Sequence, residues 1–247
     1  PDPGGLFSFG FSLDPMALRE FYEARLDAME ADPFECEQLA ELQASTVKGR
    51  EVLAQPIPPV VYNFRGIFAN VIDVAGFDMA AKMPPESLDA TILFAMENAQ
   101  DVVNMAALMN PQIAALNLLP DGEARMLDLP ELGEFAGQAF AALTNSGLAV
   151  ALGESAEREA EAALQADVSS PQPLMSLSMD AARYYDFVAE SVMQAEDSEE
   201  EEPMPLEFRE AMRDVVVSSS KVYERMLMNV HVTDRGIEID SRVTLAD

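Results

Sequence analysis

The chain has 247 residues, of which 49% are hydrophobic, so it can bury one large core or two modest ones. Its 44 acidic residues far outnumber its 15 basic residues and leave a formal net charge of −29 at pH 7. A surface this acidic repels nucleic acid and anionic lipid, so we expect neither as a partner.

The sequence shows no segment that could span a membrane and no export signal. The longest apolar stretches, at 91–96 and 146–152, are far too short to cross a bilayer, and the first residues lack the basic and apolar regions of a signal peptide. We therefore expect the protein to be soluble as given. Because the chain starts at Pro1 and not at a methionine, we also expect a leader or an upstream domain to have been removed.

Two helices are predicted before residue 55. Asp14 can cap the free amides of a helix start, and Pro15 is suited to its first turn. An apolar stripe at helical spacing follows, formed by Leu18, Phe21, Tyr22, Leu26 and Met29. A second helix is predicted at 34–53. We expect residues 1–55 to form an antiparallel helical hairpin that packs on a main domain at 56–247.

The main domain mixes strands with helices. The predicted elements, in chain order, are one strand or two strands at 60–74, kinked near Gly66, a strand at 87–96, a helix at 98–109, a hairpin of 113–119 and 123–129, a helix at 130–143, a strand at 146–153, a helix from Ser155, a strand at 174–179, and helices after Asp180 and from Pro205. Residues 196–204 include an acidic run, which predicts an exposed and mobile loop.

Residues 225–245 predict a long β-hairpin. Alternate positions place apolar side chains on one face, with Ser241 the one polar interruption: Met226, Met228, Val230, Val232, Ile237, Ile239, Val243 and Leu245. Gly236 suits the left-handed position that closes the turn. Two such strands are not stable alone, so we expect them to complete a larger sheet or to lie under helices.

This order of elements predicts an α+β fold with a mainly antiparallel sheet that helices cover on one face. A doubly wound parallel sheet is the alternative, but it would not explain two hairpins.

Few residues offer chemistry. Cys36 is the only cysteine, so an internal disulfide is impossible. The helical pattern around it predicts a buried, inert thiol, and the alternative is a bridge to a cysteine outside this chain. His231, the only histidine, alternates with Val230 and Val232 and is expected on the polar face of its strand. The spacing of glycines fits no nucleotide fingerprint, and we predict no metal, no cofactor and no catalytic residue.

Arg65 and several methionines are the candidate ligand-binding residues. Arg65 lies in an apolar strand, so it must reach solvent or pair with a carboxylate. We interpret it as a paired or edge-facing arginine, with a ligand anchor as the alternative. The methionines that would suit an adaptable apolar cavity are Met96, Met105 and Met109, together with Met126, Met175 and Met179.

Two segments resemble a group of known proteins. The run from Gly147 to Gly153 with the Ala/Glu-rich helix after it, and the run from Val232 to Ile239, look like segments of exported bacterial proteins of unknown function, some of them lipoproteins. The resemblance covers mainly the C-terminal half. It implies a periplasmic or cell-surface location and assigns no catalytic residue.

These observations favour a non-enzymatic exported protein that binds a partner protein or an apolar small molecule through its sheet. One alternative is an enzyme of unrecognised class that uses carboxylates and Arg65. A second alternative is a structural domain of a larger envelope protein.

Overall fold

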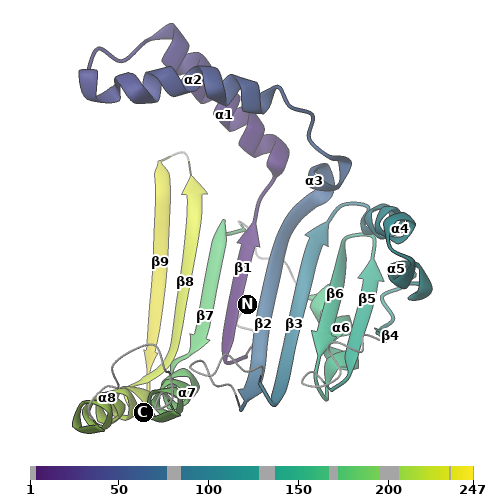
Figure 1. Ribbon diagram of the computed structural model, residues 1–247, viewed down its shortest axis with the longest axis vertical. Helices are drawn as coiled ribbons and strands as arrows, with labels where there is room; N and C mark the ends of the chain where they lie inside the picture. Colours follow the sequence, from purple (N-terminus) through teal and green to yellow (C-terminus); the bar gives the residue numbers. More distant parts are fainter. Residues whose placement is uncertain are drawn as a thin grey trace.

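The computed structural model describes residues 4–76, 85–127, 137–166, 172–194, 206–233 and 235–246 (Figure 1). Its strands are β1 (Phe7–Ser12), β2 (Phe64–Ala75), β3 (Ser87–Met96), β4 (Arg125–Met126), β5 (Ala139–Thr144), β6 (Gly147–Leu152), β7 (Met175–Asp180), β8 (Tyr223–Thr233) and β9 (Gly236–Leu245). They form one nine-stranded sheet in the order β4-β5-β6-β3-β2-β1-β7-β8-β9. Every pair of neighbours is antiparallel.

Eight α-helices connect these strands within the described residues. They are α1 (Pro15–Ala31), α2 (Ala40–Leu53), α3 (Pro59–Asn63), α4 (Ala99–Met109), α5 (Pro111–Ala115), α6 (Ala156–Gln165), α7 (Ala181–Gln194) and α8 (Leu206–Ser220). The mixture of helices with a large antiparallel sheet confirms the predicted α+β class.

The N-terminal strand β1 lies in the middle of the sheet, between β2 and β7 (Figure 1). Its three phenylalanines alternate with Ser8, Gly10 and Ser12, which is the period-two pattern of a strand. A Cβ at Gly10 would clash with the Ser176 hydroxyl oxygen, so glycine lets β1 and β7 pair without a shift of that side chain. The strand β1 was not among the predicted elements, although it joins the two sides of the sheet.

The helices α1 and α2 lie beyond one end of the strands (Figure 1). The Asp14 carboxylate caps α1 by accepting hydrogen bonds from the backbone amides of Met16 and Ala17. The two helices pack closely where Gly49 of α2 meets Leu26 of α1, whose side chain is buried. Arg50 of α2 also forms ion pairs with two carboxylates of α1.

Two predicted elements between residues 113 and 143 are wrong. The expected hairpin of 113–119 and 123–129 is replaced by α5, a loop and the two-residue strand β4. The expected helix at 130–143 ends in the strand β5 instead, and residues 128–136 lie outside the described part. Both faces of β5 are buried, so its apolar residues are continuous and do not show the alternation that indicates a strand.

Helices pack on both faces of β5, which differs from the expectation of one covered face. Leu143 and its alternate neighbours pack with Val103 of α4 on one side. Phe140 and Ala142 pack with Ala156 and Ala160 at α6 on the other side. Among the described residues, the β5–β6 end of the sheet is therefore the most completely buried.

Further predictions near the chain surface have mixed outcomes. The strand expected at 60–74 begins only at Phe64, after α3, and its register with β3 shifts between Phe64 and Gly66, where a kink was predicted. Cys36 is exposed, so the prediction of a buried thiol is wrong. The predicted acidic loop at 196–204 lies outside the described residues.

Candidate docking surface

The register of the central strands collects apolar side chains on one face of the sheet. Phe9 of β1 lies opposite Ala69 of β2 and opposite Leu177 of β7. Leu177 in turn lies opposite Met228 of β8, and Met228 lies opposite Ser241 of β9. Because residues directly opposite one another in an antiparallel sheet share a face, these side chains form one row across five strands.

Rows on either side of this one are also apolar. We name the shared surface on β1, β7, β8 and β9 the apolar sheet face. It consists of Phe7, Phe9, Phe11, Met175, Leu177, Met179, Met226, Met228, Val230, Val232, Ile237, Ile239, Val243 and Leu245.

The opposite face of the same strands is polar. Ser8 of β1 lies opposite Asn70 and Ser178, and all three side chains are almost fully buried. The Arg225 guanidinium donates a hydrogen bond to the Ser178 hydroxyl, over 3.3 Å. His231 belongs to this polar face, because it pairs with Glu238 and alternates with two valines of the apolar sheet face. The sheet is therefore two-sided at this end.

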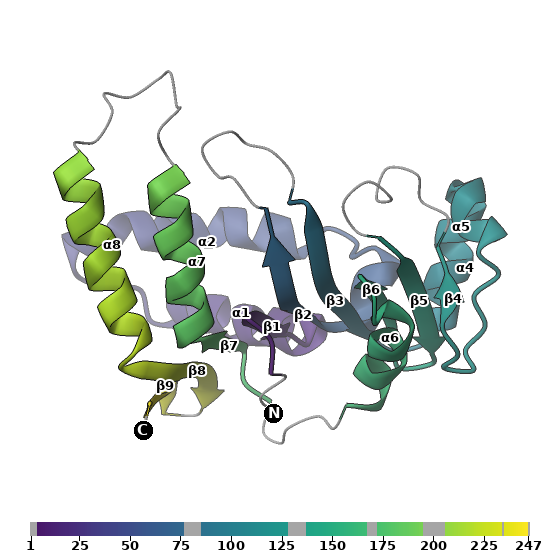
Figure 2. The ribbon, with the colours of Figure 1, turned by 90° about the horizontal axis from the view of Figure 1, so that it is seen from below.

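No described helix lies across the apolar sheet face. Figure 2 shows α7 and α8 standing on one side of the sheet, while α6 lies on the other. The helices α7 and α8 contact β8 near its first residue. There the ring of Tyr185 of α7 lies 6.3 Å from the ring of Tyr223. Further along, Val232, Ile237 and Ile239 are 61%, 72% and 66% exposed. A row of exposed aliphatic side chains on a long strand is unusual for a solvent-facing surface, because water solvates apolar groups poorly.

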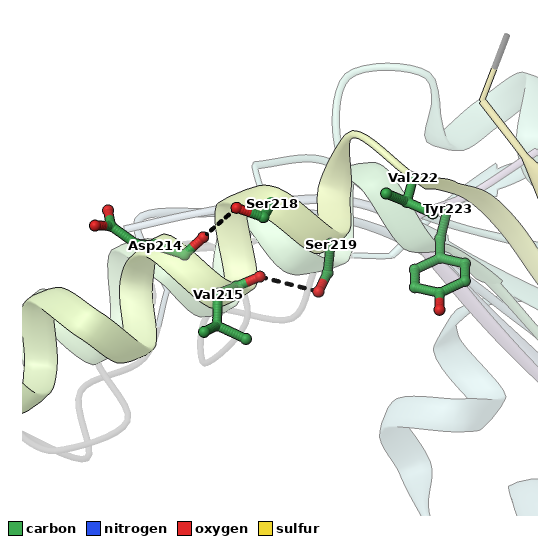
Figure 3. A pocket seen from close by; sticks show the side chains of 6 residues that line it. All are labelled: Asp214, Val215, Ser218, Ser219, Val222 and Tyr223. Atoms are coloured by element: carbon green, nitrogen blue, oxygen red, sulfur yellow. Dashed lines mark hydrogen bonds between the residues drawn. The ribbon is translucent and has the colours of Figure 1, made fainter.

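Two hollows in the described part of the surface are open and not enclosed. The larger has a volume of about 430 Å³ and lies where α8 meets β8 (Figure 3). Its two serine hydroxyls donate to carbonyls of their own helix, Ser218 to Asp214 at 2.7 Å and Ser219 to Val215 at 2.9 Å. Both hydroxyls are thus occupied by local hydrogen bonds.

The smaller hollow, of about 210 Å³, lies between α1, α2 and the segment that follows α2. Leu18, Tyr22, Val52, Leu53 and Ile57 supply most of its lining, and Arg19 supplies the charged group. The Arg19 guanidinium is already engaged by Glu23 at 2.9 Å and by the Leu53 carbonyl at 2.6 Å. The hollow is a shallow apolar seam between the helices.

The candidate ligand residues from the sequence do not converge on either hollow. Arg65 pairs with Glu97 at 3.0 Å and donates to the carbonyls of Tyr62 and Phe64, both at 2.8 Å. It therefore ties the start of β2 to the end of β3, as expected for a paired arginine. Of the methionines, Met96 packs against the core below α4, whereas Met109 is 84% exposed.

Met126, Met175 and Met179 are the other three candidate methionines. Met126 is exposed at the short strand β4. Met175 and Met179 lie on the apolar sheet face, where the register places them opposite Val230 and Met226. The apolar side of the β8–β9 hairpin was predicted from the sequence, but its continuation into β1 was not. The alternating phenylalanines of residues 7–11 were the available signal.

The charged groups with shifted pKa values serve local structure. A hydrogen bond from Arg125 lowers the pKa of Asp121 from 3.8 to about 2, and a backbone hydrogen bond from Ala17 lowers the pKa of Asp14. No group of three potential metal ligands occurs in the described ranges. No helix in the same ranges is both long and apolar enough to cross a membrane.

Comparisons with known proteins add no relative. No family model matches the chain, and neither a curated protein nor a solved structure shows significant similarity to it.

Proposed function

We propose that this protein is a binding module whose apolar sheet face docks onto an apolar surface of a partner protein. The observation that carries the proposal is the continuity of that face. Four neighbouring strands contribute apolar side chains to it, and no described helix lies across them. Contiguous apolar surfaces of this extent on a folded chain are typical of interaction sites.

The shape of the surface favours a protein over a small apolar molecule. A small-molecule site encloses most of its ligand in a concave cavity. The two hollows are open: the larger reaches the apolar sheet face only at Tyr223, which lies opposite Leu245, and the smaller lies between α1 and α2. A flat sheet face with exposed aliphatic side chains instead resembles the apolar core of a protein interface, which is closed by the partner.

An enzymatic function has less support. Arg65, which the alternative would use, has its guanidinium engaged by Glu97 and two backbone carbonyls. The strongly lowered pKa of Asp121 belongs to an exposed ion pair and not to a cleft. Perturbed groups that stabilise local structure are no evidence for catalysis.

We place the binding module outside the cytoplasm, at the periplasm or cell surface. This part of the proposal rests on the resemblance of residues 147–153 and 232–239 to segments of exported proteins. Fractionation of cells that express the full-length protein tests it. Recovery in the cytoplasmic fraction would contradict the proposed location without affecting the docking surface.

A matched pair of substitutions on β8 tests the docking surface. Met228 lies on the apolar sheet face, whereas its neighbour Asn229 lies on the polar face. Nile red is uncharged, so the net charge of −29 does not repel it. We expect saturable, blue-shifted Nile red emission from the folded chain, with affinity reduced roughly threefold to tenfold by Met228→Lys and unchanged by Asn229→Lys.

Circular dichroism of both variants confirms that they are folded, and Val232→Lys provides a second substitution on the same face at a more exposed position. Equal effects of Met228→Lys and Asn229→Lys, or no Nile red binding by the native chain, would contradict the proposal.

A further inference from the structure

The strand β9 forms one edge of the sheet, and no described residue pairs with its outer backbone groups. The Ala246 amide donates to the Val222 carbonyl at 3.0 Å, so even-numbered residues at this end direct their backbone groups toward β8. At the other end Thr233 lies opposite Gly236, with two residues between them in the chain, and this pairing sets the same phase. The backbone groups of Ile237, Ile239, Ser241, Val243 and Leu245 therefore point away from the sheet.

The sequence of β9 is nearly symmetric in residue type around Ser241. Ile239 and Val243 are equidistant from it and both aliphatic, and so are Ile237 and Leu245. Asp240 and Arg242, its direct neighbours, carry opposite charges. Both are exposed, and neither forms an ion pair or a side-chain hydrogen bond with another described residue.

We propose that two copies of this protein pair through β9, antiparallel and around a two-fold axis at Ser241. Ile237 then lies opposite Leu245 of the second copy, Ile239 opposite its Val243, and Asp240 opposite its Arg242. The outward backbone amides and carbonyls of the odd-numbered residues then form hydrogen bonds with those of the second copy, as an antiparallel ladder requires. Asp240 and Arg242 occupy the closer, non-hydrogen-bonded pairs, where opposite charges attract most strongly.

Other registers of the same pairing are less favourable. An axis at Asp240 would place this carboxylate opposite its own copy, and an axis at Arg242 would do the same for the guanidinium. Like charges directly opposite one another destabilise a strand pair. An axis at Ser241 also overlaps the whole of β9, because Ser241 is the midpoint of 237–245. The charges and the length of the strand thus select one register.

This pairing goes beyond the proposed function, because it uses the edge of the sheet and leaves the apolar sheet face open. In the dimer, the apolar sheet faces of the two copies lie side by side and form one wider surface. The net charge of −29 on each copy opposes association, and salt screens this long-range repulsion more than it weakens a paired edge. Dimerisation is therefore expected to strengthen between low and physiological salt.

A charge exchange tests the pairing and its register. Sedimentation equilibrium of the full chain between about 1 and 200 µM measures the dimer fraction. Asp240→Arg and Arg242→Asp are each expected to weaken dimerisation roughly tenfold, because like charges then face each other, and the double exchange is expected to restore it. Asp214→Arg and Arg213→Asp on α8 make the same changes in net charge away from β9 and are expected to have no such effect.

A cysteine placed on the axis gives an independent readout. In a Cys36→Ser background, Ser241→Cys is expected to form a disulfide-linked dimer under mild oxidation, because only residue 241 faces its own copy. Ile239→Cys, on the same face of the strand, is expected to remain unlinked. A chain that is monomeric throughout the concentration range, a double exchange that does not restore dimerisation, or equal linking by the two cysteines would overturn the proposal.

Discussion

Single charged side chains in this fold hold local structure together. Asp121 forms an ion pair with Arg125 at 2.6 Å and accepts a hydrogen bond from the Glu123 backbone amide at 3.0 Å. These two interactions stabilise the turn before β4. Arg65 has a comparable role between β2 and β3. These pairs are partly exposed, and exposed ion pairs contribute little to the free energy of unfolding. The Asp121–Arg125 and Arg65–Glu97 pairs instead help to determine where β4 and β2 start.

Replacement of Asp121 by asparagine is expected to destabilise the protein near neutral pH and less in acid. The pKa of Asp121 is lowered to about 2 in the folded state, below its ordinary value of 3.8. The stabilisation is therefore complete above 3.8 and is lost as the pH falls toward 2. Urea unfolding at pH 7 and pH 3 measures the free energy of unfolding of wild type and of Asp121→Asn. We expect the difference between the two proteins to be smaller at pH 3. Asp214→Asn, on α8, serves as the control. A difference in the free energy of unfolding that grows in acid would contradict the stabilising role of the ionised Asp121 carboxylate.

At the scale of elements, the two ends of the sheet differ in how they are covered. At β5 and β6, α4 and α6 enclose the strands from both sides, and Leu143 is 0% exposed. At β8 and β9, aliphatic residues of the same kind remain accessible to water. The same sheet thus contains a complete core at one end and an uncovered apolar face at the other.

This difference predicts unequal costs for similar truncations. Leu143→Ala removes a fully buried side chain and leaves a cavity, so it is expected to lower the free energy of unfolding by about 2–5 kcal/mol. Val232→Ala removes a side chain that is 61% exposed and is expected to cost less than about 1 kcal/mol. Chemical denaturation at low protein concentration measures both. Comparable losses at the two positions would show that the apolar sheet face is packed.

The sequence predicted the elements that have strong local signals. The N-cap of α1, the strands β3 and β7 and the hairpin of β8 and β9 all lie close to where they were predicted from the sequence. β5 was mistaken for part of a helix because it is apolar on both faces. β1 was missed although its phenylalanines alternate, because the strand has only six residues and its partners β2 and β7 are distant in sequence. The candidate surface depends on that pairing, so only its C-terminal part was predictable.

For the whole molecule, a strongly acidic exterior accompanies a broad apolar face. The charge weakens association between separate molecules without preventing it, whereas burial of the apolar sheet face by a partner lowers the free energy of the complex. Acidity of this kind disfavours indiscriminate association and permits binding to a partner with a matching apolar surface.

Hydroxyl-radical footprinting of the native monomer tests the uncovered face most directly, because it compares residues of one type within one molecule. Phe7, Phe9 and Phe11 lie on the apolar sheet face, whereas Phe140 is 8% exposed below α6. The peptide that contains residues 7–11 is expected to be oxidised several-fold faster per phenylalanine than the peptide that contains Phe140. Equal protection of the two peptides would mean that the face is already covered, and it would contradict the docking surface proposed here.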